Sequence, residues 1–113
     1  MNVHVEANRI GVLLLKLGLK ENTKSYAYYK YAVELASTDT AKLNQMIKDV
    51  YQPMSIYFNE TISEVEREMR KTIASIYREV SELFEDMIKE RTACYPTVSE
   101  VLAVLVCFNN RNN

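Results

Sequence analysis

Three basic side chains within five residues of one another have a spacing that suits contact with a polyanion. In an α-helix, Arg67, Arg70 and Lys71 would share the broad side opposite the apolar positions of the same segment. Such groups bind phosphate oxygens, and arginine also binds the O6 and N7 acceptors of guanine in the major groove of DNA. The pattern therefore predicts a helix with one packing face and one face that can bind DNA. The packing positions would be Ile62, Val65, Met69, Thr72/Ile73 and Ile76.

The start of this helix carries further candidate DNA-binding residues. Thr61 and Glu64 have the spacing of a capping box, in which a hydroxyl and a carboxylate satisfy each other's backbone N–H donors. Thr61 and Ser63 are also candidates to reach phosphates. Glu64 is a candidate to accept from a cytosine amino group, but a carboxylate near DNA phosphates usually weakens binding. We therefore favour the cap as the role of Glu64.

An ordinary solvated helix face is the competing interpretation of these charges. Glu64 with Arg67, and Glu66 with Arg70, would form intrahelical pairs that contribute only a few tenths of a kcal/mol each. The preceding residues favour DNA, because residues 53–58 form a predicted short helix and Asn59 suits a tight turn. A short helix, a turn and a second helix is the layout of a helix-turn-helix, whose second helix enters the major groove.

The elements that position this segment are predicted to be helices in a single compact domain. Two glycines and two prolines among 113 residues leave few breaks, which favours an all-α fold over a sheet. We expect about six helices and a domain over residues 1–108, followed by a disordered tail at 109–113. The expected helices cover about 4–17, 23–36, 40–51, 53–58, 61–77 and 97–108, and residues 81–89 either continue the fifth helix or form a separate segment.

Local signals mark the ends of these helices. Gly18 suits a left-handed C-terminal cap, Thr23 can cap the second helix, and Asp39 or Thr38 can cap the third. In the third helix the positions expected to face inward are Leu43, Met46, Ile47 and Val50. The tyrosines at 26, 28, 29 and 31 are candidates for stacking on bases, but helical spacing favours rings buried in the core.

Composition and charge limit the classes of function that this chain can have. The net charge is −1, with a basic first half and an acidic last third, which is a weaker basic excess than DNA-binding domains commonly have. The chain contains no glycine-rich loop and no nucleophile beside a base, so we expect no enzyme, no catalytic residue and no cofactor. We also expect no metal site, because Cys94 and Cys107 do not form a CxxC pair and His4 is the only histidine. Cys107 is expected to be buried and Cys94 to lie in a loop.

The apolar runs are too short to cross a membrane, since the longest spans residues 101–108 against the roughly 20 residues that a bilayer requires. The N-terminus also lacks a basic segment followed by an apolar signal core. We therefore expect a cytoplasmic protein with no membrane partner.

Four short segments together resemble a known family. They are residues 17–26 (LGLKENTKSY), 48–51 (KDVY), 58–70 (FNETISEVEREMR) and 96–100 (PTVSE). In order and approximate spacing, they are similar to the C-terminal DNA-binding effector domain of the sporulation initiation regulator, stage zero sporulation protein A. The resemblance covers nearly the whole chain and implies a six-helix fold with an embedded helix-turn-helix. It also implies sequence-specific binding of promoter DNA by a transcription regulator, often as tandem domains, with the last helix near the contact between domains.

The resemblance implies that Arg67 and Arg70 match family arginines on the recognition helix, while Lys71 replaces another polar residue. Glu64 is a departure, because it stands where the family is expected to have an arginine, and Glu68 adds a second acid beside Arg67. Both changes should weaken DNA affinity. The chain also has no room for the receiver domain of the family's regulator, so we expect an isolated effector domain or a stand-alone homologue.

The acids on the recognition face support an alternative. The same fold could serve as a protein-interaction or dimerisation module with weak or no DNA binding, using the tyrosine-rich second helix or the apolar last helix. A continuous basic surface around Arg67 would favour DNA, and a surface interrupted by acids would favour the alternative.

Overall fold

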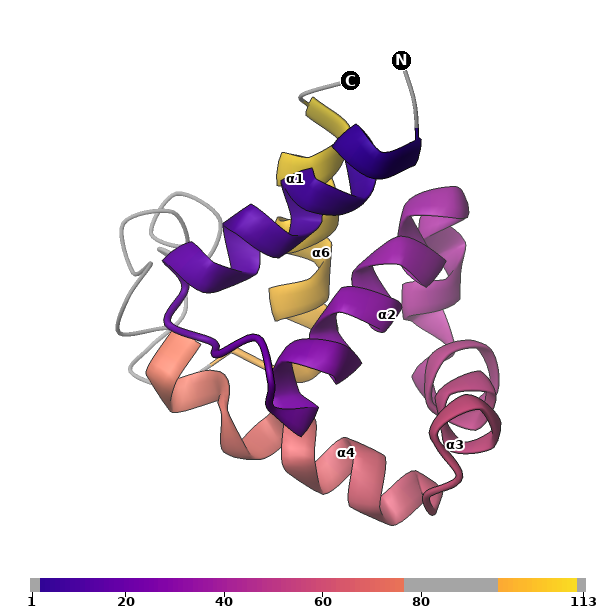
Figure 1. The fold of residues 1–113 in the computed structure, drawn as a ribbon. Helices are drawn as coiled ribbons and strands as arrows, with labels where there is room; N and C mark the ends of the chain where they lie inside the picture. The colour runs from indigo at the N-terminus through magenta and orange to yellow at the C-terminus, as the bar shows by residue number, and fades with distance from the viewer. Residues whose placement is uncertain (1–2, 77–95, 112–113) are drawn as a thin grey trace.

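Helix α2 (Lys24–Thr38) is the central element around which the other helices pack (Figure 1). The computed structural model describes residues 3–76 and 96–111. The chain forms α1 (Val3–Lys16), α2, a 3-10 helix η1 (Thr40–Asn44), a π-helix η2 (Ile47–Tyr51), α3 (Gln52–Phe58), α4 (Ile62–Lys71) and α6 (Val98–Arg111). A further helical turn covers residues 73–76. Within the described ranges there is no strand, and the all-α prediction is confirmed.

One hydrophobic core joins the α-helices that the structure describes. Its largest fully buried side chains include Leu14 and Leu17 of the N-terminal part, Tyr29 of α2, Met69 of α4 and Leu102 of α6. Tyr26 and Tyr28 are buried with Tyr29, so these three rings belong to the core, as their spacing predicted. Tyr31 is half-buried and lies with its ring centroid 4.6 Å from that of Tyr57. The tyrosine-rich helix is therefore mainly a packing element.

The predicted helix ends are confirmed where a local backbone requirement set them. Gly18 has the left-handed φ of 89° expected after a helix. The Thr23 side chain accepts a hydrogen bond from the Tyr26 N–H at 3.2 Å. Asp39 accepts from the Ala41 N–H at 3.0 Å and so caps η1. Each signal acts within three residues, which is why it could be recognised in the sequence.

The predicted third helix is wrong in type. Residues 40–51 form η1 and η2 in place of one α-helix, and η2 runs directly into α3. Pro53 provides a physical reason, because a proline ring within an α-helix collides with the carbonyl four residues before it, and a wider π turn relieves that collision. The change of pitch also rotates the side chains. Ile47 was expected to face inward, but it is 66% exposed, whereas Val50 is fully buried as predicted.

The C-terminal helix is longer than predicted. Helix α6 continues to Arg111, so the prediction of a disordered tail from residue 109 is wrong for residues 109–111. Asn109 helps to hold this end, since its Nδ2 donates to Ser37 Oγ at 3.2 Å. The prediction that Cys107 is buried is also wrong. Cys107 lies one helical turn after the half-exposed Ala103, on the side of α6 that faces away from the core.

Some predictions fall outside the described residues. These are the loop position of Cys94, the continuation of the fifth helix to Tyr77, and the segment at 81–89. No helix in the described part of the chain is long and apolar enough to cross a membrane.

Candidate nucleic-acid interface

Helices α3 and α4 form the predicted helix-turn-helix. Asn59 ends α3 in the left-handed conformation, with φ 55° and ψ 47°, as expected for this turn. Two further contacts close the turn, because the Glu60 N–H donates to the Ser55 carbonyl at 3.1 Å and Ser55 Oγ donates to the Glu60 carbonyl. The direction in which α4 leaves α3 is therefore fixed by hydrogen bonds within six residues. In Figure 1, α4 lies along the lower edge of the molecule, away from the first turn of α1 and the last turn of α6.

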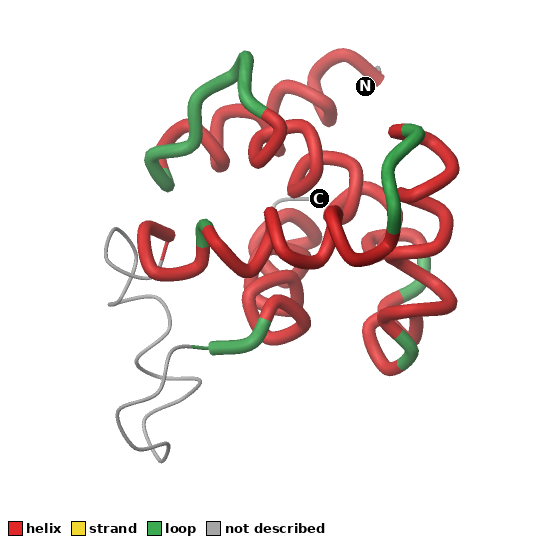
Figure 2. The backbone as a smooth tube through the Cα atoms, turned by 90° about the horizontal axis from the view of Figure 1, so that it is seen from below, coloured by secondary structure: helices red, strands yellow, loops and turns green. Residues whose placement is uncertain are grey.

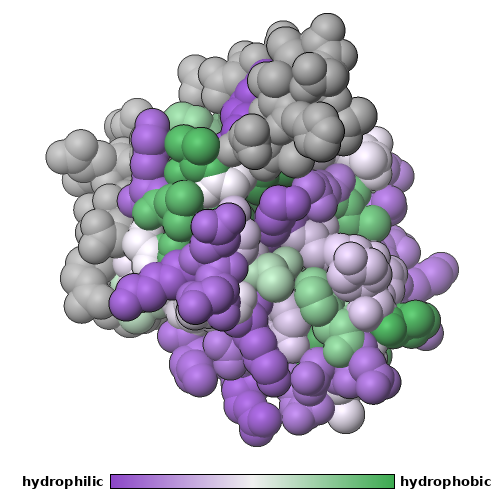
Figure 3. Space-filling model, in the orientation of Figure 1, coloured by the Kyte–Doolittle hydropathy of each residue, from purple (hydrophilic) through white to green (hydrophobic). Residues whose placement is uncertain are grey.

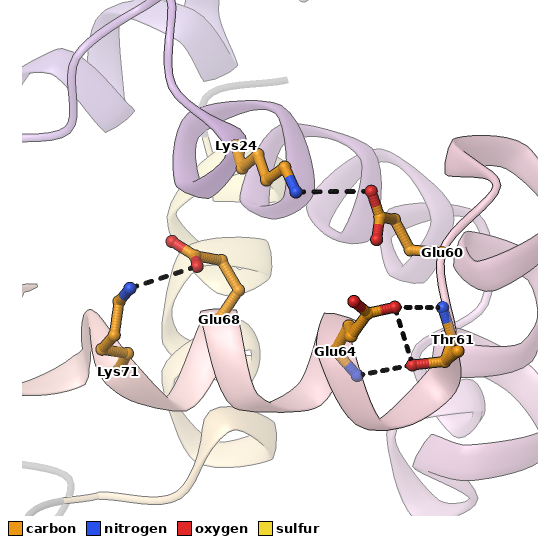
Figure 4. A network of polar contacts seen from close by, with 6 residues as sticks. All are labelled: Lys24, Glu60, Thr61, Glu64, Glu68 and Lys71. Carbon is orange, nitrogen blue, oxygen red and sulfur yellow. Dashed lines mark hydrogen bonds and ion pairs between the residues drawn. The ribbon is translucent and has the colours of Figure 1, made fainter.

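The first turn of α4 has the predicted capping box. Thr61 Oγ1 accepts from the Glu64 N–H at 3.1 Å, and Glu64 Oε1 accepts from the Thr61 N–H at 3.0 Å (Figure 4). The Thr61 hydroxyl also lies 2.9 Å from Glu64 Oε1 and donates to it. These hydrogen bonds lower the pKa of the Glu64 carboxyl below its ordinary value, because they favour the charged form. Thr61 and Glu64 therefore satisfy each other's backbone N–H groups at the start of α4 without a ligand.

Two side-chain hydroxyls mark the end of α4. Val65 and Met69 are fully buried, as predicted, and the Met69 carbonyl accepts from Tyr29 Oη at 2.7 Å and from Thr72 Oγ1 at 3.0 Å. Thr72 adopts φ −91° and ψ −4°, which breaks the helix after Lys71 (Figure 2). The prediction of an unbroken helix from residue 61 to about 77 is therefore wrong at Thr72. Ile73 and Ile76 still pack inward, as predicted, from the helical turn after the break.

The side chains predicted to face away from the core are exposed. We define the exposed ridge as Ser63, Arg67, Arg70 and Lys71, which all lie on the solvent side of α4. Arg67 has no ion pair among the described residues, so the predicted pair with Glu64 does not form. The predicted pair of Glu66 with Arg70 does form, at 2.9 Å. Hydrophilic residues dominate the lower edge of the surface in Figure 3, where Figure 1 places α4.

The ion pairs on and beside α4 share one asymmetry. In each, the cation is well exposed and the carboxylate is shielded. The side chain of Arg70 is 63% exposed, against 32% for Glu66. Lys71 is 71% exposed and its partner Glu68, at 3.4 Å, is 25% exposed. Lys24 of α2 is 64% exposed and its partner Glu60, at 3.3 Å, is 25% exposed. The basic groups therefore form the outer layer of this surface, although the numbers of charges balance.

Helix α2 contributes residues to this surface that the sequence pattern did not indicate. Lys24 reaches Glu60, and Ser25 Oγ donates to Glu68 Oε2 at 2.9 Å. Figure 4 shows Glu68 extending from α4 toward α2, while Lys71 approaches it from the next turn. Each contact to α2 joins residues at least 36 positions apart, so no local spacing could have revealed it. Glu68 thus differs from Glu64, which is exposed at the start of α4.

A comparison with protein families identifies the family to which this chain belongs. The family described as "Sporulation initiation factor Spo0A C terminal" matches residues 10–107, which include every side chain of the exposed ridge. That family is the DNA-binding effector domain of a sporulation regulator, and it is a regulatory domain as opposed to a class of enzyme. The match spans most of the 113 residues, and the chain therefore belongs to the family of Spo0A C-terminal domains.

Proposed function

We propose that this domain regulates transcription by binding double-stranded promoter DNA through the exposed ridge of α4. Arg67, Arg70 and Lys71 are the principal contacts in this proposal. Ser63 is exposed and can donate to a phosphate, and Thr61 can do so if it gives up its hydrogen bond to Glu64 Oε1. The observation that carries the proposal is that cations lie outside and carboxylates lie beneath them in the ion pairs of this surface.

The internal ion pairs are compatible with DNA binding because they are weak. An exposed pair stabilises a protein by about 0–1 kcal/mol, so Arg70 and Lys71 can exchange a carboxylate for a phosphate at small cost. Their partners Glu66 and Glu68 are already shielded and stay behind the cations when that exchange occurs. Arg67 needs no exchange, since it has no ion pair within the described ranges. We therefore assign the reading of a base to Arg67 and phosphate contacts mainly to Lys71 and Arg70.

Glu64 is the one acid of this face that the packing does not shield. Its hydrogen bonds to Thr61 keep it ionised, so it repels phosphates near the start of α4. We propose that the cap is its main role and that its charge lowers the affinity for DNA. If Glu64 contacts a base, its carboxylate can accept a hydrogen bond from the amino group of cytosine in the major groove.

The test is selection of duplexes from a randomised library, followed by titration of a selected duplex and a shuffled one by fluorescence anisotropy. We expect the wild type to prefer the selected duplex, with an affinity that falls as salt rises. Arg67→Ala should weaken binding to the selected duplex by about 1–3 kcal/mol, or roughly 5- to 150-fold. Lys42→Ala is the matched control, because it removes one positive charge from η1, an element that packs on α2 and α6.

Folded wild-type protein that binds no duplex at low or moderate salt would exclude this function. It would leave the protein-interaction or dimerisation module as the remaining proposal. In that case sedimentation and pull-down experiments should reveal a dimer or a partner. Equal losses for Arg67→Ala and Lys42→Ala would show that charge alone, and not the ridge, governs binding.

A further inference from the structure

We infer that Ser25 is a positioning residue for DNA binding, because it holds the Glu68 carboxylate against α2 and away from the exposed ridge. This role rests on the proposed function, since it matters only if the ridge of α4 meets phosphates. Ser25 lies in the first turn of α2 and does not itself belong to the recognition helix. Its partner Glu68 is one of the two acids that set this chain apart from the expected family pattern.

The hydroxyl of Ser25 is placed unusually for a serine. Ser25 is 6% exposed, and it is the one buried polar or charged residue within residues 9–76 and 96–110. A buried hydroxyl needs a hydrogen-bond partner, because leaving it unpaired destabilises the folded state. The partner is Glu68 Oε2, at 2.9 Å. Two buried hydroxyls of α2 thus donate to α4, and whereas Tyr29 donates to a backbone carbonyl, Ser25 donates to a carboxylate.

Glu68 is shared between a neutral donor and a cation. Its Oε2 accepts from Ser25, while its Oε1 lies 3.4 Å from Lys71 Nζ. When Lys71 moves to a phosphate, Glu68 loses its ion pair but keeps the hydrogen bond to Ser25. Without Ser25, the Glu68 carboxylate would lose its hydrogen bond to α2, and its easiest route to solvation would lead toward the exposed side of α4, where Arg67 and Lys71 project. A unit negative charge there would oppose the approach of each nearby phosphate.

The size of that effect follows from Coulomb's law. Two unit charges about 6 Å apart in water repel enough to weaken binding roughly threefold, and the repulsion grows as water is excluded. We therefore expect Ser25→Ala to weaken DNA binding by about three- to tenfold. Glu68→Gln should bind DNA at least as tightly as the wild type, because its amide oxygen still accepts from Ser25 and its negative charge is gone.

The experiment is an anisotropy titration of a selected duplex at several salt concentrations with Ser25→Ala, Glu68→Gln and the double variant. The double variant should recover the affinity of Glu68→Gln, because no carboxylate remains to be released. Ser37→Ala is the matched control, since it removes a serine hydroxyl from the other end of α2, where its partner is Asn109 and no carboxylate is involved. It should bind DNA like the wild type.

A purely structural role for Ser25 predicts a different pattern. In that case the double variant would stay as weak as Ser25→Ala, and this result would overturn the inference, as would Ser25→Ala that binds like the wild type. If Ser25→Ala does not fold, Glu68→Ala provides the test instead, because it removes the carboxylate itself. Weaker DNA binding by Glu68→Ala than by the wild type would contradict the inference that a released carboxylate harms binding. A wild type that binds no duplex excludes the proposed function itself, which distinguishes the two failures.

Discussion

The Met69 carbonyl accepts hydrogen bonds from two side-chain hydroxyls, so we expect the stability of the end of α4 to depend on Tyr29. Tyr29→Phe removes the shorter hydrogen bond, at 2.7 Å, from a fully buried ring without changing the ring's packing. The Thr72 hydroxyl, at 3.0 Å, continues to satisfy the carbonyl. The loss should therefore be that of one net hydrogen bond, about 1 kcal/mol of unfolding free energy. In a domain of this size, that corresponds to a decrease in Tm of about 4 °C.

Removal of both hydroxyls should cost more than the sum of the single losses. In Tyr29→Phe combined with Thr72→Val, the buried Met69 carbonyl has neither hydroxyl, and an unsatisfied group of this kind costs about 1–3 kcal/mol. The assay is urea unfolding followed by far-UV circular dichroism for the wild type, both single variants and the double variant. Tyr57→Phe is the control, because the Tyr57 ring is 67% exposed and its change should stay within about 0.5 kcal/mol. Additivity of the two single variants to within about 0.5 kcal/mol would refute the shared carbonyl.

Two pH dependences follow from the shifted groups. Hydrogen bonds lower the pKa of Glu64 in the folded state, so its contribution to stability is present above about pH 4 and is lost as the pH falls through the folded pKa. The Tm difference between the wild type and Glu64→Gln should shrink over that range, and a constant difference would contradict the cap as the cause. Burial raises the pKa of Tyr51 from 10.0 to about 12, so its contribution is present below pH 10 and is lost as the pH rises toward 12. Tyr51→Phe should therefore lose less stability than the wild type between these values, and parallel Tm curves would count against the shift.

The sequence predicted the parts of this structure that depend on near neighbours. Asn59 and Thr61 mark the turn and the start of α4 because they satisfy backbone groups within a few residues. The exposure of Arg67, Arg70 and Lys71 follows from helical periodicity, which the buried Val65 and Met69 fix on the other side. These features are local, so propensity and spacing are sufficient to find them.

The features that the sequence did not reveal depend on contacts between distant segments or on a departure from α-helical pitch. The helix break at Thr72 accompanies a hydrogen bond from Tyr29, 40 positions from Met69. The shielding of Glu68 depends on Ser25, which lies 43 positions away. The sequence therefore suggested that Glu68 lies on the proposed DNA-binding face, whereas in the structure its carboxylate is held toward α2. The exposure of Ile47 results from the π-helix before Pro53, whose pitch a 3.6-residue pattern does not describe. Tertiary packing thus overrode the helical pattern at Thr72 and Glu68, whereas the nearby Pro53 overrode it at Ile47.

Under the proposed function, the break at Thr72 also limits how much DNA sequence α4 of one copy can read. Helix α4 has ten residues and is therefore about 15 Å long at a rise of 1.5 Å per residue. Neighbouring base pairs are spaced by about 3.4 Å, so this helix extends along roughly four of them. A given sequence of four base pairs occurs by chance about once every few hundred base pairs, whereas a genome offers about 10⁶–10⁹ competing sites. Under the proposed function, one α4 therefore carries too little information to specify a promoter, and we expect selective binding to need two or more copies on adjacent sites or bases read by other parts of the chain.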